Sequence, residues 1–170
     1  MKTPISKIES ATAGKHEVRY YLKNAWLDVE KKRLIATDGH ICAIVPAELE
    51  EGDITGPITS EALKNARASK SKSIEAKGSL VLDNSASYPR EPGIKYPDVD
   101  RIRPTEEFKI VISLDAALLL RLAEAINDPE KNYRKSQVVT LHISGPESTV
   151  QVTGNNPDAV GMIMPIRIKS

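Results

Sequence analysis

Cysteine, histidine and aromatic residues are scarce in this chain of 170 residues. The only cysteine is Cys42, so no disulfide forms within the chain and no zinc site can be built from cysteines. The three histidines, His16, His40 and His142, are far apart in the sequence and indicate no metal site. The phosphate-binding patterns GxxxxGK[ST] and GxGxxG are absent as well, so we expect no cofactor.

Long apolar runs are also missing. No stretch approaches the length that spans a bilayer, and the N-terminus, Met1-Lys2-Thr3-Pro4, lacks the apolar run of a signal peptide. We therefore expect a globular protein of the cytoplasm that makes no contact with a membrane.

The chain also lacks an excess of charge of one sign. The chain has 24 Lys and Arg against 23 Asp and Glu, so its net charge of +1 gives no general argument for nucleic-acid binding. One local basic run contains no acidic residue from Lys64 to Lys72. It is a candidate DNA-contacting strip, although such runs are also typical of solvated surfaces. Its members are Lys64, Arg67, Lys70 and Lys72.

Short strands and one helix are predicted in the first half of the chain. The predicted strands are 17–23, 25–29, 33–36, 41–45, 73–76 and 79–82. The turn between 33–36 and 41–45 contains Asp38-Gly39, a strong turn signal. A helix is predicted over 59–68, capped by Thr59 and stapled by Ile58 and Leu63.

The segment 83–104 contains four prolines and is the best candidate for a linker. Beyond it, we predict a strand at 108–112, a helix at 114–126 capped by Ser113 and stopped by Asn127-Asp128-Pro129, and strands at 138–143, 149–152 and 162–168. A strand–helix–strands unit thus occurs twice. The pattern predicts an α+β fold of antiparallel sheets with two main helices.

Four segments, in this order, resemble the bacterial DNA polymerase III β subunit, the sliding clamp. They are Val18-Arg19-Tyr20-Tyr21-Leu22, Ala36-Thr37-Asp38-Gly39-His40, Tyr96-Pro97-Asp98-Val99-Asp100-Arg101-Ile102 and Met162-Ile163-Met164-Pro165-Ile166-Arg167-Ile168. The last two are similar to the family's FPDYRRV connector and its C-terminal VVMPMRL. Taken alone, Thr-Asp-Gly-His is typical of a β-turn and Met-Pro of an edge strand. The order of all four indicates a DNA-clamp-like fold.

The resemblance implies a groove that binds the clamp-binding peptides of polymerases and repair proteins. One departure is Ile41-Cys42, which stands where the family has Arg-Leu after the turn. The peptide-binding residues carried over are Tyr21, Leu22, Thr37, Gly39, His40, Pro97, Arg101, Ile102, Thr149, Met162, Met164, Pro165 and Arg167.

The resemblance also implies a shortened clamp. Residues 1–94 would correspond to part of the middle domain, 95–107 to a connector and 108–170 to the second half of the last domain. Three interpretations stay open: a processivity factor that assembles as a homo-oligomeric ring on duplex DNA, a monomeric peptide-binding module or decoy competing with a full-length clamp, and a degenerate structural remnant.

Catalysis is not expected. Asp38 and His40 form the only close acid–histidine pair in a turn, and Cys42 lies two residues beyond it. Nothing in the sequence indicates the oxyanion hole that a nucleophilic mechanism also needs. We therefore predict a binding protein that is not an enzyme.

Overall fold

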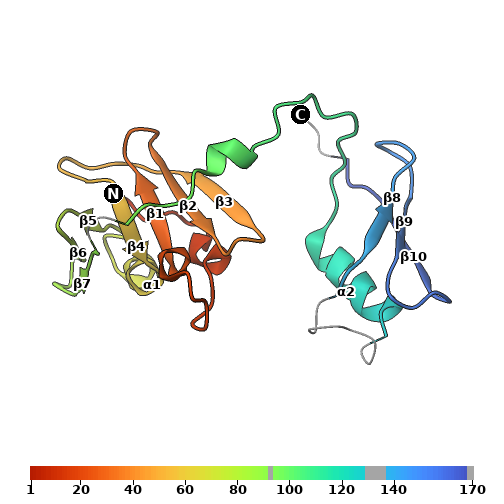
Figure 1. The fold of residues 1–170 in the computed structure, drawn as a ribbon, viewed down its shortest axis with the longest axis horizontal. Coiled ribbons are helices and arrows are strands. Elements are labelled where there is room, and N and C mark those ends of the chain that lie inside the picture. The colour runs from red at the N-terminus through yellow and green to blue at the C-terminus, as the bar shows by residue number, and fades with distance from the viewer. Residues whose placement is uncertain (92–93, 129–136, 168–170) are drawn as a thin grey trace. The chain divides into compact units, whose positions relative to one another are not determined.

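The computed structural model describes residues 1–91, 94–128 and 137–167, which form two compact units, Met1–Arg103 and Pro104–Ser170. The boundary between them falls within the range 95–107 predicted as a connector. The elements of the first unit are η1 (Ile8–Ala11), η2 (Tyr20–Lys23), β1 (Asn24–Asp28), β2 (Arg33–Thr37), β3 (Cys42–Pro46), β4 (Gly56–Thr59), α1 (Ser60–Ala68), β5 (Glu75–Ala76), β6 (Ser79–Val81), β7 (Ser87–Pro89) and η3 (Val99–Ile102). Those of the second are α2 (Ala116–Ile126), β8 (Thr140–His142), β9 (Val150–Thr153) and β10 (Val160–Ile163) (Figure 1).

The first unit is built on a four-stranded antiparallel sheet of order β3-β2-β1-β4. Leu27 of β1 lies opposite Leu34 of β2, and both side chains are fully buried. Alternate residues of β1 are buried, as expected for a strand with one face on the core. The strands predicted at 25–29, 33–36 and 41–45 are therefore confirmed to within one residue.

Helix α1 covers this core. The Thr59 hydroxyl accepts a hydrogen bond from the Ala62 amide at 3.2 Å, so the predicted cap is confirmed. The helix buries Ala62, Leu63 and Ala66 completely. After α1, strands β5, β6 and β7 form a second antiparallel sheet. The edge strand β7 was not predicted, although Pro89 at its end is compatible with an edge position.

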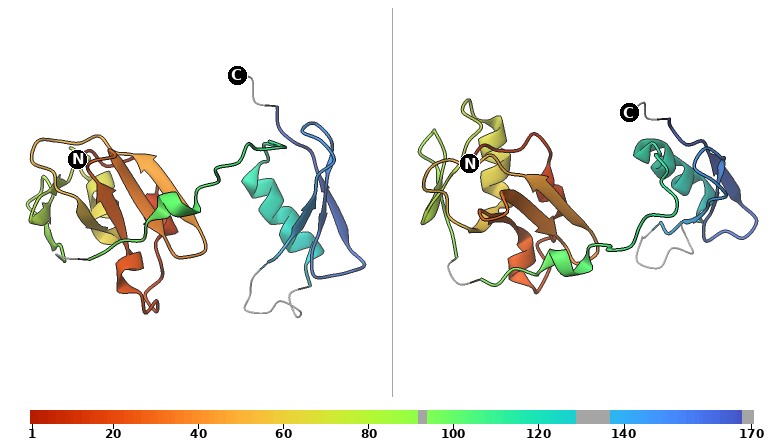
Figure 2. Two further views of the ribbon diagram at one scale, coloured as in Figure 1. Left: turned by 45° about the horizontal axis from the view of Figure 1, so that its top comes forward. Right: turned by 90° about the horizontal axis from the view of Figure 1, so that it is seen from above.

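The second unit has one helix lying along one face of a three-stranded antiparallel sheet of order β10-β9-β8 (Figure 2). Its core is small, with Ile126 of α2 packed against Val150, Val152 and Ile163. The Asn127 side chain ties the helix end to the turn after β9, because its carbonyl oxygen accepts a hydrogen bond from the Asn155 amide at 2.8 Å. A Cβ atom at Gly154 would lie 2.5 Å from that oxygen, so a larger residue there would require the Asn127 side chain to shift.

Other sequence predictions were wrong, shifted or too long. The residues predicted as a strand at 17–23 contain the 3₁₀ turn η2, and those at 108–112 form no strand. The cap of α2 is Asp115 instead of Ser113, since its carboxylate accepts from the amides of Ala117 and Leu118. Strand β10 ends at Ile163, so 164–167 lie beyond it. Two predicted residues lie outside the described part of the chain. Pro129 is the last residue of the predicted helix stop, and Ile168 is the last residue of the strand predicted at 162–168.

Two general features of the described chain bear on function. No helix among residues 1–91, 94–128 and 137–167 is long and apolar enough to cross a membrane. Within those same residues, no three His, Cys, Asp or Glu side chains come together in a way that would hold a metal ion.

Candidate functional site

The turn between β2 and β3 is held rigidly by its own side chains. The Thr37 hydroxyl donates to the Ile41 carbonyl at 2.6 Å and accepts from the Gly39 amide at 3.1 Å. The Asp38 carboxylate accepts from the amides of His40 and Ile41, both at 2.8 Å. These backbone N–H groups lower the pKa of Asp38 below its ordinary value. The turn leaves His40 exposed while Thr37 is buried beneath it.

Arg19 connects this turn to the segment before η2. Its guanidinium donates to the Asp38 carbonyl at 3.4 Å and is held by the Glu17 carboxylate at 3.0 and 3.1 Å. Hydrogen bonding to Arg19 lowers the pKa of Glu17 to about 2. Gly39 has φ +91°, and a Cβ atom there would lie 3.0 Å from the Arg19 guanidinium nitrogens. Glycine therefore permits both the turn and this close approach.

Tyr21 and Leu22 are the two predicted peptide-binding residues in η2, and they differ in accessibility. Tyr21 is half-buried, and its ring meets that of Tyr20 edge-on at 5.9 Å. Leu22 is 2% exposed, so its side chain supports the surface from below instead of lining it.

A third segment of the first unit is residues 94–103, which we call the strap. The Tyr96 ring stacks on Trp26 of β1 with centroids 5.4 Å apart. The Tyr96 hydroxyl is buried near the Thr37 backbone, and burial raises the pKa of this phenol. The strap thereby joins the turn region, and its residues Pro97, Arg101 and Ile102 are exposed. Three of the four segments with the resemblance thus belong to one unit.

The fourth segment lies in the second unit. Met162 and Met164 are 70% and 63% exposed, and they line a hollow of about 500 Å³ with α2. The remaining lining residues are Leu118, Arg121, Leu122, Ala125 and Ile163. The Thr149 hydroxyl donates to the Met164 sulfur at 2.9 Å, which fixes the position of that side chain. The second unit therefore has two adaptable apolar side chains exposed beside a hollow.

A second hollow of about 460 Å³ lies on the other side of Met164. Pro165 and Arg167 line it together with residues 111–113 and Pro146-Glu147. The Arg167 guanidinium pairs with the Glu147 carboxylate at 2.8 Å, and both side chains are largely exposed. An exposed pair of this kind is weak, so Arg167 can exchange it for another carboxylate at little cost.

The residues of the basic run have different environments. Lys64, Lys70 and Lys72 are exposed. Arg67 instead forms a bidentate ion pair with Glu9, with nitrogen–oxygen distances of 2.7 and 2.6 Å. Its donors are therefore occupied within the protein, and three lysines remain accessible for a phosphate backbone.

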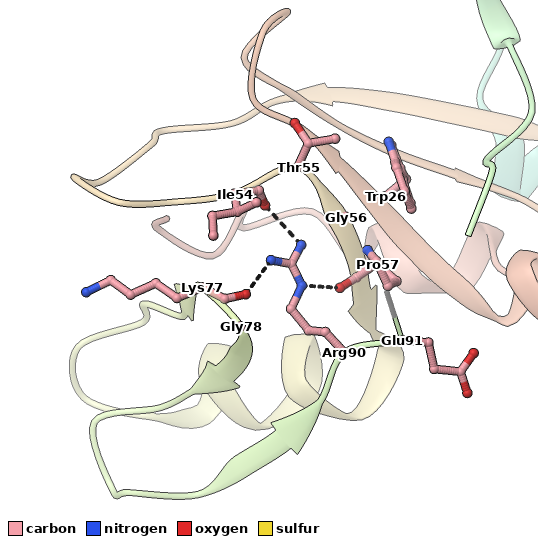
Figure 3. Close-up of a pocket in the computed structure, with 9 residues that line it drawn as sticks. All are labelled: Trp26, Ile54, Thr55, Gly56, Pro57, Lys77, Gly78, Arg90 and Glu91. Atoms are coloured by element: carbon pink, nitrogen blue, oxygen red, sulfur yellow. Dashed lines mark hydrogen bonds between the residues drawn. The ribbon is translucent and has the colours of Figure 1, made fainter. Parts of the chain in front are cut away.

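A hollow of about 240 Å³ in the first unit surrounds Arg90 (Figure 3). The guanidinium donates to the carbonyls of Pro57 at 3.0 Å, Lys77 at 2.8 Å and Ile54 at 3.0 Å, and Figure 3 shows the Lys77 ammonium group extending away from it. Burial lowers the pKa of Arg90. Because backbone carbonyls use most of its donors, Arg90 ties the residues after β7 to β4 and is a structural contact.

Four of the residues that organise this region were not among the predicted site residues. Arg19, Asp38, Trp26 and Asp100 position the turn and the strap, and only Asp38 carried a local signal, as the first residue of an Asp-Gly turn. The others act on partners distant in the sequence, such as Asp100, which pairs with Arg33 of β2.

This arrangement of helices and antiparallel sheets is that of bacterial sliding clamps. The chain is similar to the β sliding clamp of C. crescentus, with a TM-score of 0.67 and 20% identity over 94% of this chain and 47% of that one. It is also similar to the DNA polymerase III β subunit of Bartonella birtlesii bound to griselimycin, with a TM-score of 0.66 and 21% identity over 96% of this chain and 49% of that one. For the Borrelia burgdorferi subunit in complex with a natural product, the TM-score is 0.65 and the identity 16% over 93% and 44%.

These similarities confirm the predicted clamp-like fold. No protein-family model and no curated protein sequence matches the chain. The chain spans about half the length of the solved clamps above, because each match covers only 44% to 49% of the clamp. Structural similarity at this low sequence identity shows the fold alone, so function has to be argued from the residues.

Proposed function

We propose that this clamp-like protein binds short linear peptides of replication or repair proteins in the cytoplasm, as a non-enzymatic binding protein. The observation that carries the proposal is the exposure of Met162 and Met164 beside the hollow at α2. Two exposed methionines at a hollow form a surface that adapts to the large apolar side chains of different peptides. Neighbouring apolar side chains exposed beside a hollow are typical of an interaction site, so this pair supports a binding role.

Each unit also has exposed polar side chains among the predicted peptide-binding residues. His40, Arg101 and Arg167 are exposed and offer N–H donors to a peptide's carbonyl or carboxylate oxygens. Ile102 adds apolar surface on the strap. In this proposal, Leu22 and Thr37 act from beneath the surface, and the exposed residues contact the peptide.

The correspondence to parts of a clamp is included in the proposal. Residues 1–94 would represent part of the middle domain, 95–107 a connector and 108–170 the second half of the last domain. Ring formation on DNA requires several copies with head-to-tail contacts, whereas a module or decoy acts as a monomer. Mass in solution separates these forms, because a monomer does not encircle DNA.

Peptide titration tests the proposed function. A fluorescently labelled extended peptide with a Gln and two large apolar residues is titrated with protein, and anisotropy is measured. We expect saturable binding of micromolar order, weakened at least about tenfold by Met164→Asp because a carboxylate is then placed at an apolar contact.

Val138→Asp is the matched control. Val138 is an equally exposed aliphatic residue of the same unit, 67% exposed, and it lines neither hollow. It should bind the peptide as the wild type does. No binding by the wild type at high protein concentration would refute the proposed function and favour a structural remnant.

DNA contact by the three accessible lysines is a separate part of the proposal. Replacing Lys64, Lys70 and Lys72 together should weaken binding to duplex DNA and reduce its dependence on salt concentration, because fewer phosphate counterions are released. Unchanged affinity and salt dependence would exclude this strip as a DNA contact.

A further inference from the structure

A few side chains of the strap (residues 94–103) anchor it to the rest of the first unit. Tyr96 stacks on Trp26 with an interplanar angle of 13°, and Val99 is 5% exposed. Both strap residues also line a hollow of about 380 Å³ whose opposite wall includes Trp26, Arg33 and Ile35. The strap is therefore attached at two points and leaves a partly open space between them.

The ionic attachment is centred on Asp100. Its carboxylate accepts from Arg33 Nη1 and Nη2, both at 2.7 Å, and from the Lys31 ammonium group. Arg33 is oriented in turn by the Asp28 carboxylate, which accepts from its Nε at 3.0 Å. A bidentate guanidinium–carboxylate pair is directional, so it sets the orientation of the chain around Asp100 as well as its position. Consistent with this, Arg33 and Lys31 hold the pKa of Asp100 well below its usual range.

The strap residues that do not anchor it are the exposed ones. Pro97 follows the anchor Tyr96, and Arg101 and Ile102 follow the anchors Val99 and Asp100. The Arg101 side chain makes no hydrogen bond or ion pair within the described part of the chain. Anchoring one set of residues therefore fixes the direction in which the other set points.

We propose that Asp100 and Tyr96 are positioning residues, which dock the strap on β1 and β2 and so present Pro97, Arg101 and Ile102 to the bound peptide. This inference rests on the proposed peptide-binding function. It also predicts that salt regulates peptide binding, because salt weakens the ionic contact between partly exposed groups that holds the strap. A loosened strap lowers the fraction of protein that is competent to bind, and the apparent Kd rises by the same factor.

Trp26 gives a direct readout of docking. It is the only tryptophan of the chain, and Tyr96 covers its ring. Loss of docking should shift Trp26 emission to longer wavelength and increase its quenching by acrylamide. We expect this change in Asp100→Asn and Tyr96→Leu, and in the wild type as NaCl is raised.

Peptide affinity is measured on the same proteins by anisotropy. If docking falls to about one tenth in Asp100→Asn, the peptide Kd should rise about tenfold. Saturating peptide should return the Trp26 emission of this variant toward that of the wild type, because binding selects the docked strap. Asp100→Glu, which retains the carboxylate, should recover part of the affinity.

Arg103→Ala is the control, since the Arg103 side chain is exposed on the strap, does not line the hollow beside Trp26 and makes no hydrogen bond or ion pair among the described residues. It should change neither emission nor affinity. A shifted Trp26 emission with unchanged peptide affinity in Asp100→Asn would overturn the positioning role while leaving the proposed function intact. Unchanged emission in both Asp100→Asn and Tyr96→Leu would overturn docking itself. Absence of peptide binding by the wild type would overturn the proposed function, and the positioning role with it, whatever the emission shows.

Discussion

The ion pair between Arg67 and Glu9 permits a quantitative test of the structure. Arg67 lies in the last turn of α1, and its guanidinium donates to both carboxylate oxygens of Glu9 in η1. The Glu9 side chain is 5% exposed and that of Arg67 21%. The same guanidinium donates to the carbonyls of Pro4 and Ser6. Arg67 therefore fastens the N-terminal segment to the helix.

Arg67→Met removes the charge and keeps most of the apolar stem. Glu9 is then left nearly buried without a cation, a change that costs about 3–5 kcal/mol in a fully buried pair. Since the Arg67 end of this pair is partly solvated, we expect a loss of about 2–3 kcal/mol in the free energy of unfolding at pH 7. Urea unfolding followed by far-UV circular dichroism measures it.

The stabilisation by the Arg67–Glu9 pair should depend on pH in a definite direction. Hydrogen bonding to Arg67 lowers the pKa of Glu9 below its ordinary value of 4.5. A lowered pKa in the folded state means that the pair stabilises the protein above pH 4.5 and that this stabilisation is lost as the pH falls through the lower value. The difference between wild type and Arg67→Met should therefore be largest near neutral pH and narrow in acid.

Lys64→Met is the matched control, because Lys64 lies in the same helix and the same basic run but is exposed. Its stability should change by less than about 0.5 kcal/mol. The double variant Glu9→Gln/Arg67→Met should lose less than the sum of its single changes. If Arg67→Met is as stable as Lys64→Met at pH 7, the ion pair does not hold the N-terminal segment, and Arg67 returns to the set of candidate DNA contacts.

Two further predictions concern a helix cap and a turn. Asp115→Ala should destabilise the second unit by about 1 kcal/mol in urea unfolding, whereas Ser113→Ala should have little effect, because the Asp115 carboxylate caps α2; equal effects would contradict the observed cap. Gly39→Ala should cost about 1–2 kcal/mol because of its left-handed backbone, whereas Gly14→Ala, with nothing within 4 Å of a new Cβ, should be close to neutral; thermal unfolding compares them, and equal melting temperatures would contradict the turn geometry.

Local rules predicted the parts of the fold that depend on neighbouring residues. Thr59 caps α1 because a hydroxyl reaches the amide three residues on, and this can be recognised from the sequence alone. The Asp38-Gly39 turn was predicted for a similar reason. The stack of Tyr96 on Trp26 joins residues far apart in the chain, and no local rule contains it. The candidate site was therefore predicted as separate segments, without the contacts that organise the turn and strap.

The difference between β4 and residues 108–112 shows why strand propensity alone was insufficient. Both segments precede a capped helix, but β4 pairs along its length with β1 of the same unit. Residues 108–112 include Phe108, Ile110 and Val111, which favour strands, yet these side chains are largely exposed and the segment pairs with no strand among the described residues. The nearest backbone link is one hydrogen bond from the Ile166 amide to the Ser113 carbonyl. A β-strand requires a partner for its amide and carbonyl groups, so β4 forms in the first unit although it contains Gly56 and Pro57, whereas residues 108–112 form no strand despite their favourable residues.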